Sequence, residues 1–210
     1  MKSSTGRTVY ILLATLIIWF ALCLQFNISL KLSNGDYLQT LKIFLSFFTV
    51  TTNIIAAICF TFLLFLEKSK IGRFFAKGST LTAIAVYILV VALIYNVALR
   101  GLLHPVGWVR IADELLHVVN PVIFLGFWVF YGDKSNLKYK DTVNWLIYPL
   151  LYVVFIVIRG SLINKYPYPF IDVVKLGYPK AITNTVIILI IFWLLSLLAV
   201  FLGKHIFKKN

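Results

Sequence analysis

Six long apolar runs occupy most of this sequence, and they constrain its fold more than any other feature. The hydrocarbon core of a bilayer is about 30 Å thick, and a helix needs about 20 apolar residues to cross it. Because lipid satisfies no backbone polar group, we expect each run to be helical. The sequence thus predicts an all-α polytopic membrane bundle of about six transmembrane helices, as a single domain over residues 1–210. The expected spans are Val9–Phe26, Ile43–Leu66, Leu81–Leu103, Leu115–Tyr131, Val143–Ile158 and Ala181–Leu202.

The overall composition also indicates a lipid solvent. Hydrophobic residues make up 61% of the 210 positions and charged residues 13%, against about 45–50% and about 25% in soluble domains. A soluble fold of this length has too small a core to hide so much apolar surface. The shorter fourth and fifth runs contain Pro121 and Pro149, so we expect kinks there, with neighbouring helices satisfying the freed backbone groups.

Positive charge lies mainly in the connections between the runs. The formal net charge is +13, and the larger excess of lysine and arginine falls inside the cell when the N-terminus is placed there. This pattern predicts that both ends are cytoplasmic. It makes membrane lipids the expected partners and argues against nucleic acid. Helical spans favour the cytoplasmic membrane, because outer membranes carry β-barrels.

The cysteines and glycines suggest neither a metal site nor a dimer interface. Cys23 and Cys59 both lie within apolar runs, and no CxxC or Cys/His spacing is present. We therefore expect no disulfide framework, no metal and no organic cofactor. No Gly-x-x-x-Gly pair lies in the spans, so the sequence leaves the oligomeric state open.

A first group of polar residues lies near the start of the second run. Ser46, Thr49 and Asn53 are spaced by three and four residues, which places them on one face of a helix. One interpretation is helix packing, since small polar side chains allow close approach and hydrogen-bond between spans. The other is that they line a functional cavity, as polar groups at membrane depth often do.

A second group consists of Asp113, Glu114 and His117. Asp113 and His117 are four residues apart, so a helix stacks them on one face, where the carboxylate can orient or charge the imidazole. A buried histidine is often only a satisfied core residue. The adjacent carboxylates within a membrane run make a functional role an equal alternative.

A third group includes Arg159, at the expected end of the fifth span, and the Tyr-Pro repeat that follows it. Proline cannot continue a helix, so the stretch from Tyr166 to Asp172 predicts an ordered loop or lid over the outer mouth. Ion pairs between Arg159 and Asp172, or between Arg100 and Glu114, are both compatible with the sequence.

A hydroxyl, a histidine and a carboxylate are together the side chains of acyl-transfer catalysis. The histidine accepts the hydroxyl proton, the carboxylate fixes its tautomer, and further donors hold the oxyanion. The signatures G-x-S-x-G and H-E-x-x-H of soluble hydrolases are absent. Catalysis is thus indicated by the combination of residues and by their depth in the membrane.

Three segments carry a resemblance to a known family. They are Lys42–Asn53 (KIFLSFFTVTTN), Asp113–Pro121 (DELLHVVNP), and Arg159-Gly160 followed by Tyr166–Asp172 (YPYPFID). The sequence resembles bacterial relatives of the androgen-induced membrane-protein family over most of its length. Animal members of that family are six-span proteins that hydrolyse fatty acid esters of hydroxy fatty acids, using a threonine nucleophile and a histidine.

The resemblance implies roles for particular residues. The family histidine corresponds to His117, which keeps the following Pro121. The family threonine stands seven residues before an amide in the second span, which here corresponds to Ser46; Thr49, one turn on, is the other candidate nucleophile. The loop with Tyr168 and Asp172 is expected to shape the pocket.

The sequence therefore predicts an intramembrane hydrolase of lipid-like carboxylic esters, working in a cavity near the outer leaflet. His117 is the expected base, and Asp113 or Glu114 orients it. Asn53 and Arg159 are candidates to hold an oxyanion or a substrate carboxylate, which arginine binds bidentately. The alternatives are a lipid-binding or transport protein with a polar cavity, and a scaffold whose polar residues only pack helices.

Overall fold

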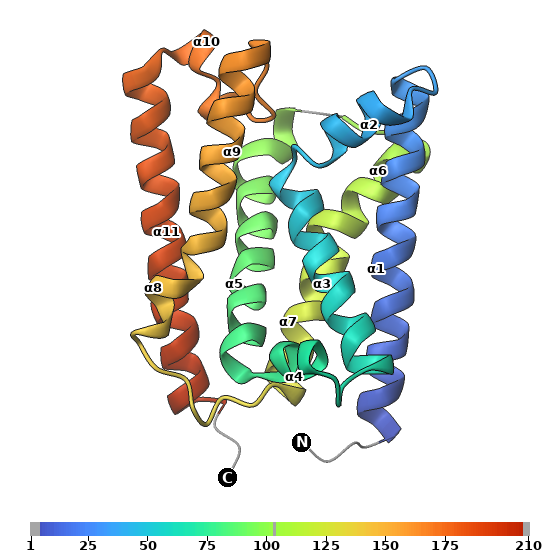
Figure 1. The fold of residues 1–210 in the computed structure, drawn as a ribbon, viewed down its shortest axis with the longest axis vertical. Helices are drawn as coiled ribbons and strands as arrows, with labels where there is room; N and C mark the ends of the chain where they lie inside the picture. Colours follow the sequence, from blue (N-terminus) through green and yellow to red (C-terminus); the bar gives the residue numbers. More distant parts are fainter. Residues whose placement is uncertain (1–4, 103, 208–210) are drawn as a thin grey trace.

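The computed structural model describes residues 5–102 and 104–207, and it is an all-α bundle (Figure 1). Six helical segments are long and apolar enough to cross a membrane, and no strand occurs in the described residues. This confirms the predicted fold class, a multi-pass membrane protein of about six spans. The spans are Thr5–Leu32, Phe48–Phe65, Gly78–Leu102, Gly107–Tyr131, Asp141–Ile163 and Tyr178–His205.

Three of these spans contain changes of helix type along their length. The third comprises α5, a π-helical turn η1 and a 3₁₀ turn η2; the fourth comprises α6, a π-helical turn η3 and α7; the fifth comprises α8 and α9. In chain order the elements are α1 Thr5–Leu32, α2 Tyr37–Phe44, α3 Phe48–Phe65, α4 Lys70–Ala76, α5 Gly78–Ile94, η1 Tyr95–Leu99, η2 Arg100–Leu102, α6 Gly107–Glu114, η3 Leu115–Val119, α7 Asn120–Tyr131, α8 Asp141–Trp145, α9 Ile147–Ile163, η4 Pro169–Ile171, α10 Val173–Leu176 and α11 Tyr178–His205.

The spans are arranged so that α5 lies in the middle of the bundle (Figure 1). It packs against α3 and α7 on one side and against α11 on the other, and α1 packs against α3. The start of α1 and the end of α11 lie at the same end of the bundle. The short elements α2 and α10, with the connection before α6, lie at the opposite end.

The second expected span is divided in the structure. A single helix over Ile43–Leu66 is wrong: α2 ends at Phe44, and α3 begins at Phe48 after an extended residue, Phe47 (φ −91°, ψ 126°). The Ser46 hydroxyl donates to the carbonyl of Lys42, a bond that competes with helix continuation. The Tyr152 hydroxyl, 2.7 Å from the carbonyl oxygen of Ser46, donates to it and satisfies it. Ser46 therefore does not share a helix face with Thr49.

Other expected boundaries also move. The fourth span begins at Gly107 instead of Leu115. Charged residues in its first two turns separate them from the apolar run that starts at Leu115. The fifth extends to Ile163, so Arg159 lies within α9 and not at its end. Leu103, the expected end of the third span, is outside the described residues.

Both expected kink sites coincide with irregular helix. Pro121 is in the first turn of α7, directly after the π turn η3, and Pro149 is in the first turn of α9, directly after the break between α8 and α9. Proline has no N–H to donate, so carbonyls of the preceding turn need other partners. The Asn53 amide donates to the carbonyl of Leu116 (3.3 Å) and the Asn96 amide to that of His117 (3.4 Å). Neighbouring spans thus satisfy the carbonyls around the wide turn, as a membrane interior requires.

The buried side chains form two apolar clusters. One joins α1, α3, α5 and α7 around Phe60, Phe124 and Phe127. The other joins α5, α8 and α11, with Phe48 of α3, and includes Phe192. Hydroxyls of Thr51 and Thr52 bond the Tyr148 hydroxyl at 2.8 and 3.1 Å, which ties α9 to α3.

Candidate active site

Asp113 and His117 form a couple on the fourth span. Nδ1 of His117 lies 2.9 Å from the carbonyl oxygen of Asp113 and 3.1 Å from its carboxylate Oδ1. Both neighbours are acceptors, so Nδ1 carries the hydrogen and donates it. Nε2 then holds the free lone pair of the neutral ring, and no hydrogen bond engages it among the described residues. The predicted i, i+4 pairing is present, in a geometry that leaves a base available.

Tyr95 of the neighbouring span contacts both members of this couple, and no sequence pattern indicates it. Its ring stacks on the imidazole of His117, with centroids 3.8 Å apart and planes 13° from parallel. Its hydroxyl donates to the second carboxylate oxygen of Asp113. The tyrosine is 5% exposed. One residue therefore fixes both the plane of the imidazole and the position of the carboxylate that orients it.

The two π-helical turns are what bring these residues together. Tyr95 and Asn96 belong to η1, and His117 belongs to η3. The Asn96–His117 bond described above links the two turns directly. Turns of this kind often occur at functional sites. A tyrosine in an apolar run predicts only core packing. The position of Tyr95 in a π turn opposite His117 is what marks it as a candidate site residue.

A cavity of about 390 Å³ lies beside the couple, at the end of the bundle opposite the termini. Asp113 and His117 line one side, and Thr49 lies on the wall contributed by α3. Gln25 and Ser29 contribute polar groups from α1. The remaining lining is mostly apolar: Phe44, Phe47, Val50, Tyr95, Leu99, Leu102, Pro105, Val109, Leu116, Pro167, Tyr168 and Pro169.

The predicted Tyr-Pro loop supplies Tyr168 to this cavity. The backbone N–H of Thr49 is 3.4 Å from the Tyr168 hydroxyl oxygen. Although part of the Tyr168 residue is exposed, its hydroxyl is surrounded by protein, and this burial raises the pKa of Tyr168. The hydroxyl therefore stays protonated at neutral pH and can donate a hydrogen bond next to the Thr49 side chain.

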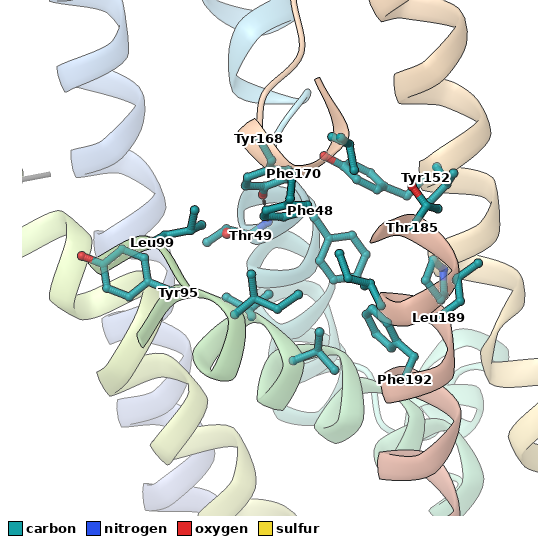
Figure 2. A pocket seen from close by; sticks show the side chains of 17 residues that line it. Phe48, Thr49, Tyr95, Leu99, Tyr152, Tyr168, Phe170, Thr185, Leu189 and Phe192 are labelled. Atoms are coloured by element: carbon teal, nitrogen blue, oxygen red, sulfur yellow. Dashed lines mark hydrogen bonds between the residues drawn. The ribbon is translucent and has the colours of Figure 1, made fainter. Parts of the chain in front are cut away.

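A second, narrow pocket of about 70 Å³, drawn in Figure 2, shares part of its lining with the first. Both are lined by Thr49, Tyr95, Leu99 and Tyr168. Beyond these shared residues the narrow pocket runs between α5, α9 and α11 and is almost wholly apolar. Figure 2 shows the stacked rings of Tyr168 and Phe170 near Thr49, with Leu189 and Phe192 farther along. The larger cavity, which contains the polar groups of the site, thus adjoins an almost wholly apolar pocket at Thr49.

Two of the expected site residues on the second run lie away from the cavity. Ser46 is 2% exposed, its hydroxyl is bonded to the backbone, and it lines neither pocket. Asn53 is fully buried; besides Leu116 it donates to the Thr49 carbonyl (2.9 Å) and accepts from the Asn120 amide (2.8 Å). Asn53 joins two spans, which is the packing role considered above.

The remaining expected residues are placed as follows. Glu114 pairs with Arg100, which realises one of the two proposed ion pairs and puts Glu114 beside the cavity instead of on it. Arg159 donates to the carbonyl of Lys165 (3.4 Å) and lines no described cavity. Asp172 accepts from the first backbone N–H groups of α10 and has no described bond to Arg159. The structure thus brings together Thr49, Asp113, His117 and Tyr168.

Residues 5–102 and 104–207 contain no group of three or more histidine, cysteine, aspartate or glutamate side chains that could hold a metal ion. The described site consists of hydroxyl, imidazole and carboxylate groups, which are the groups of proton and acyl transfer. No family model, no curated protein and no solved structure matches this chain. The family resemblance therefore stays a prediction that rests on the three sequence segments.

Proposed function

We propose that this protein is an intramembrane hydrolase of lipid-like carboxylic esters, of the fatty acid ester of hydroxy fatty acid type, in the cytoplasmic membrane. We propose with it membership of the androgen-induced membrane-protein family. One observation carries the proposal: the Asp113–His117 couple, whose Nε2 makes no hydrogen bond among the described residues, lines the same cavity as Thr49 and Tyr168.

In the first half of the reaction, Thr49 is the nucleophile and His117 the general base. Nε2 takes the Thr49 proton as Oγ1 bonds to the ester carbonyl carbon. The Asp113 carboxylate stabilises the imidazolium, and the Tyr168 hydroxyl donates to the developing oxyanion. The bond from that carbon to the alkoxy oxygen then breaks. The alcohol leaves with the proton from Nε2, and the acyl group remains on Thr49.

In the second half, water replaces the alcohol. Nε2 takes a proton from the water while its oxygen bonds to the acyl carbon. The bond to Thr49 Oγ1 then breaks, and Oγ1 recovers the proton from His117. The product is a free carboxylic acid, and both side chains return to their starting states.

The shape of the cavities favours a lipid as the substrate. An ester carbonyl at Thr49 lies where the larger cavity meets the apolar pocket, so an acyl chain has apolar walls on one side of the reacting bond. Ligand sites commonly combine a mostly apolar lining with a few placed polar groups. Many large apolar side chains of the surrounding spans are exposed, so the protein can meet an ester that is dissolved in the bilayer.

The test is hydrolysis of a panel of long-chain fatty acid esters by the purified protein in non-ionic detergent. We expect His117→Ala to lower kcat/KM by about 10²- to 10⁴-fold, the usual range for loss of a general base, and Thr49→Ala to have a similar effect. Thr61→Ala is the matched control, because Thr61 is on the same helix, bonds a backbone carbonyl and lines none of these cavities. It should retain full turnover.

Each variant is checked for folding by its thermal unfolding midpoint. If Ser46→Ala abolishes ester hydrolysis and Thr49→Ala does not, Ser46 is the nucleophile. If His117→Ala leaves the rate of ester hydrolysis unchanged, the proposed site is contradicted. A folded protein that binds these esters and hydrolyses none of them would favour the lipid-binding or transport alternative.

A further inference from the structure

The face of α1 that points into the bundle changes from apolar to polar along its length. From Ile11 to Leu22 its buried positions are mostly apolar and belong to the first apolar cluster. Gln25 and Ser29 continue the same face, because they follow Leu22 at steps of three and four residues. Both are half-buried and line the cavity beside the Asp113–His117 couple. The face therefore becomes polar where α1 reaches the proposed active site.

The backbone of α1 does not use the donors of these two side chains. Other polar side chains in the spans bond the carbonyl four residues earlier, as Thr15, Asn27 and Thr61 do. Among the described residues, the side chains of Gln25 and Ser29 make one hydrogen bond, a long one of 3.4 Å from Gln25 Nε2 to Ser29 Oγ. They join no other span. Polar groups at membrane depth without a packing role usually mark a functional site.

The packing of α1 brings these side chains next to the catalytic residues. α1 packs against α6 and η3, which carry Asp113 and His117. The other polar side chains of the cavity already have a partner or a proposed role. Tyr95 bonds Asp113, Thr49 is the proposed nucleophile, and Tyr168 is the proposed oxyanion donor. The amide and the hydroxyl on α1 are left, and the first half of the reaction does not use them.

The second half of the proposed reaction needs a water molecule in a cavity whose lining is mostly apolar. A water inside a protein typically makes roughly two to four hydrogen bonds to polar groups. Nε2 of His117 supplies one partner, the acceptor of the proton that the water loses. An amide has both donors and an acceptor, and a hydroxyl can also do both. Gln25 and Ser29 can therefore supply the remaining partners.

We propose that Gln25 and Ser29 position the water that releases the acyl group from Thr49. This rests on the proposed function and assigns α1 to the second half of the reaction. The water oxygen bonds to the acyl carbon while Nε2 takes one of its protons. Gln25 Oε1 accepts from the other hydrogen, and the Ser29 hydroxyl donates to the water oxygen. The bond from the acyl carbon to Thr49 Oγ1 then breaks, Oγ1 takes the proton from Nε2, and the carboxylic acid leaves with the second hydrogen.

The experiment separates formation of the acyl-enzyme from its breakdown. Purified protein in non-ionic detergent is mixed with p-nitrophenyl palmitate, and the burst of p-nitrophenolate measures acylation of Thr49. Intact-protein mass spectrometry then follows decay of the palmitoyl adduct after the ester is removed. We expect Gln25→Leu and Ser29→Ala each to slow this decay by about tenfold, the effect of one lost hydrogen bond, and to leave the burst unchanged. Ser29→Thr keeps the hydroxyl and should restore most of the decay rate.

Asn27→Leu is the matched control for Gln25→Leu. It makes the same kind of change on the same helix, but Asn27 is exposed, bonds the Cys23 carbonyl and does not line the cavity. It should leave the decay rate as in the wild type.

Added methanol gives a readout that a merely structural role would not change. Methanol competes with water for the acyl group, but it has no second O–H hydrogen for Gln25 to accept. Gln25→Leu should therefore lower the ratio of palmitic acid to methyl palmitate, again by about tenfold. An unchanged ratio would overturn the role given to Gln25.

The remaining outcomes distinguish this inference from the proposed function. If the variants slow the burst and not the decay, α1 contacts the ester instead of the water, and the inference is overturned. A palmitoyl adduct that forms on Thr49 and decays at the wild-type rate in both variants also overturns it, while the proposed function stands. If no adduct forms on the wild-type protein, both are contradicted.

Discussion

At the scale of single residues, the Asp113 carboxylate is the most constrained group of the site. One oxygen accepts from the imidazole of its own span, and the other accepts from Tyr95 of the neighbouring span. A carboxylate held by donors from two helices cannot rotate away when a substrate enters. The cost of this arrangement is that the site depends on how the third and fourth spans pack.

We predict that Tyr95→Phe lowers ester turnover by about 10- to 100-fold, the range found when a group that orients a reactive residue is removed. The phenyl ring keeps the stacking on His117 and loses only the donor to Asp113. The measurement is kcat against pH, because a less well-held carboxylate should also shift the acidic limb of the profile.

Tyr87→Phe is the control for this prediction. Tyr87 is a buried tyrosine on the same span whose hydroxyl donates to the carbonyl of Trp145 at 2.7 Å. Its replacement should lower the unfolding temperature and leave the pH profile in place. An equal effect of both substitutions on kcat would show that Tyr95 has only a packing role.

The residue-level site was partly predictable. Asp113 and His117 pair because a helix stacks residues four apart, and sequence spacing shows this directly. Tyr95 is 22 positions from His117 and looks like any aromatic residue in an apolar run. The choice between Ser46 and Thr49 depends on a helix break that hydrophobicity does not reveal. Contacts between spans are set by packing, which no local pattern records.

At the scale of elements, the connection between α9 and α10 is positioned by a close packing contact. A Cβ atom added to Gly160 would lie 2.1 Å from the ring of Tyr166, so the ring rests directly on the backbone of α9. Two residues later, Tyr168 reaches Thr49. The connection is thus held at Tyr166 by its packing on Gly160 and at Tyr168 by its contact with Thr49.

Gly160→Ala is expected to displace this connection, because the new methyl group cannot coexist with the ring in its present place. We predict at least about a tenfold loss of turnover, with an unfolding temperature within a few degrees of the wild type, as the displaced part is at the surface. A double variant with Tyr166→Ala removes the clash and should recover most of the turnover. Failure to recover would indicate damage to α9 itself.

Element boundaries were the least predictable part of the fold. The six helices follow from the length of the apolar runs, since a bilayer imposes that length. The run from Ile43 to Leu66 contains no polar or proline signal strong enough to mark its break at Leu45–Phe47. In the fourth span, Arg110, Asp113 and Glu114 interrupt the apolar pattern, so the first two helical turns do not show as part of an apolar run.

At the scale of the whole molecule, charged residues at both ends of the bundle join elements to one another. At the end with the termini, Arg7 is 3% exposed and pairs with Glu67 at 2.8 Å, which ties α1 to the connection after α3. The Lys134 side chain, 4% exposed, donates to the carbonyls of Val129 and Gly132 at the end of α7. At the opposite end, Arg100 of η2 pairs with Glu114 of α6, and charged residues line cavities at both ends.

We predict that the end with the termini is cytoplasmic, as the distribution of basic residues indicates. The measurement is labelling of single cysteines by a membrane-impermeant maleimide, in a chain with Cys23 and Cys59 replaced. Lys175→Cys, on α10, should react in intact cells. Lys138→Cys, in the connection before α8 at the terminal end, should react only after permeabilisation. The reverse pattern would contradict the predicted orientation.

The two π turns have a consequence for how such a protein could arise. A π turn holds one residue more than an α turn, and each residue of an α-helix advances the chain by about 100°. Deleting one residue from Leu115–Val119 would restore regular helix and rotate Asp113 out of register with His117 and Tyr95. The spans would keep their length and most of their apolar contacts. In evolutionary terms, single-residue insertions in two neighbouring helices can rearrange a few side chains at one end of a bundle whose spans otherwise stay as they were.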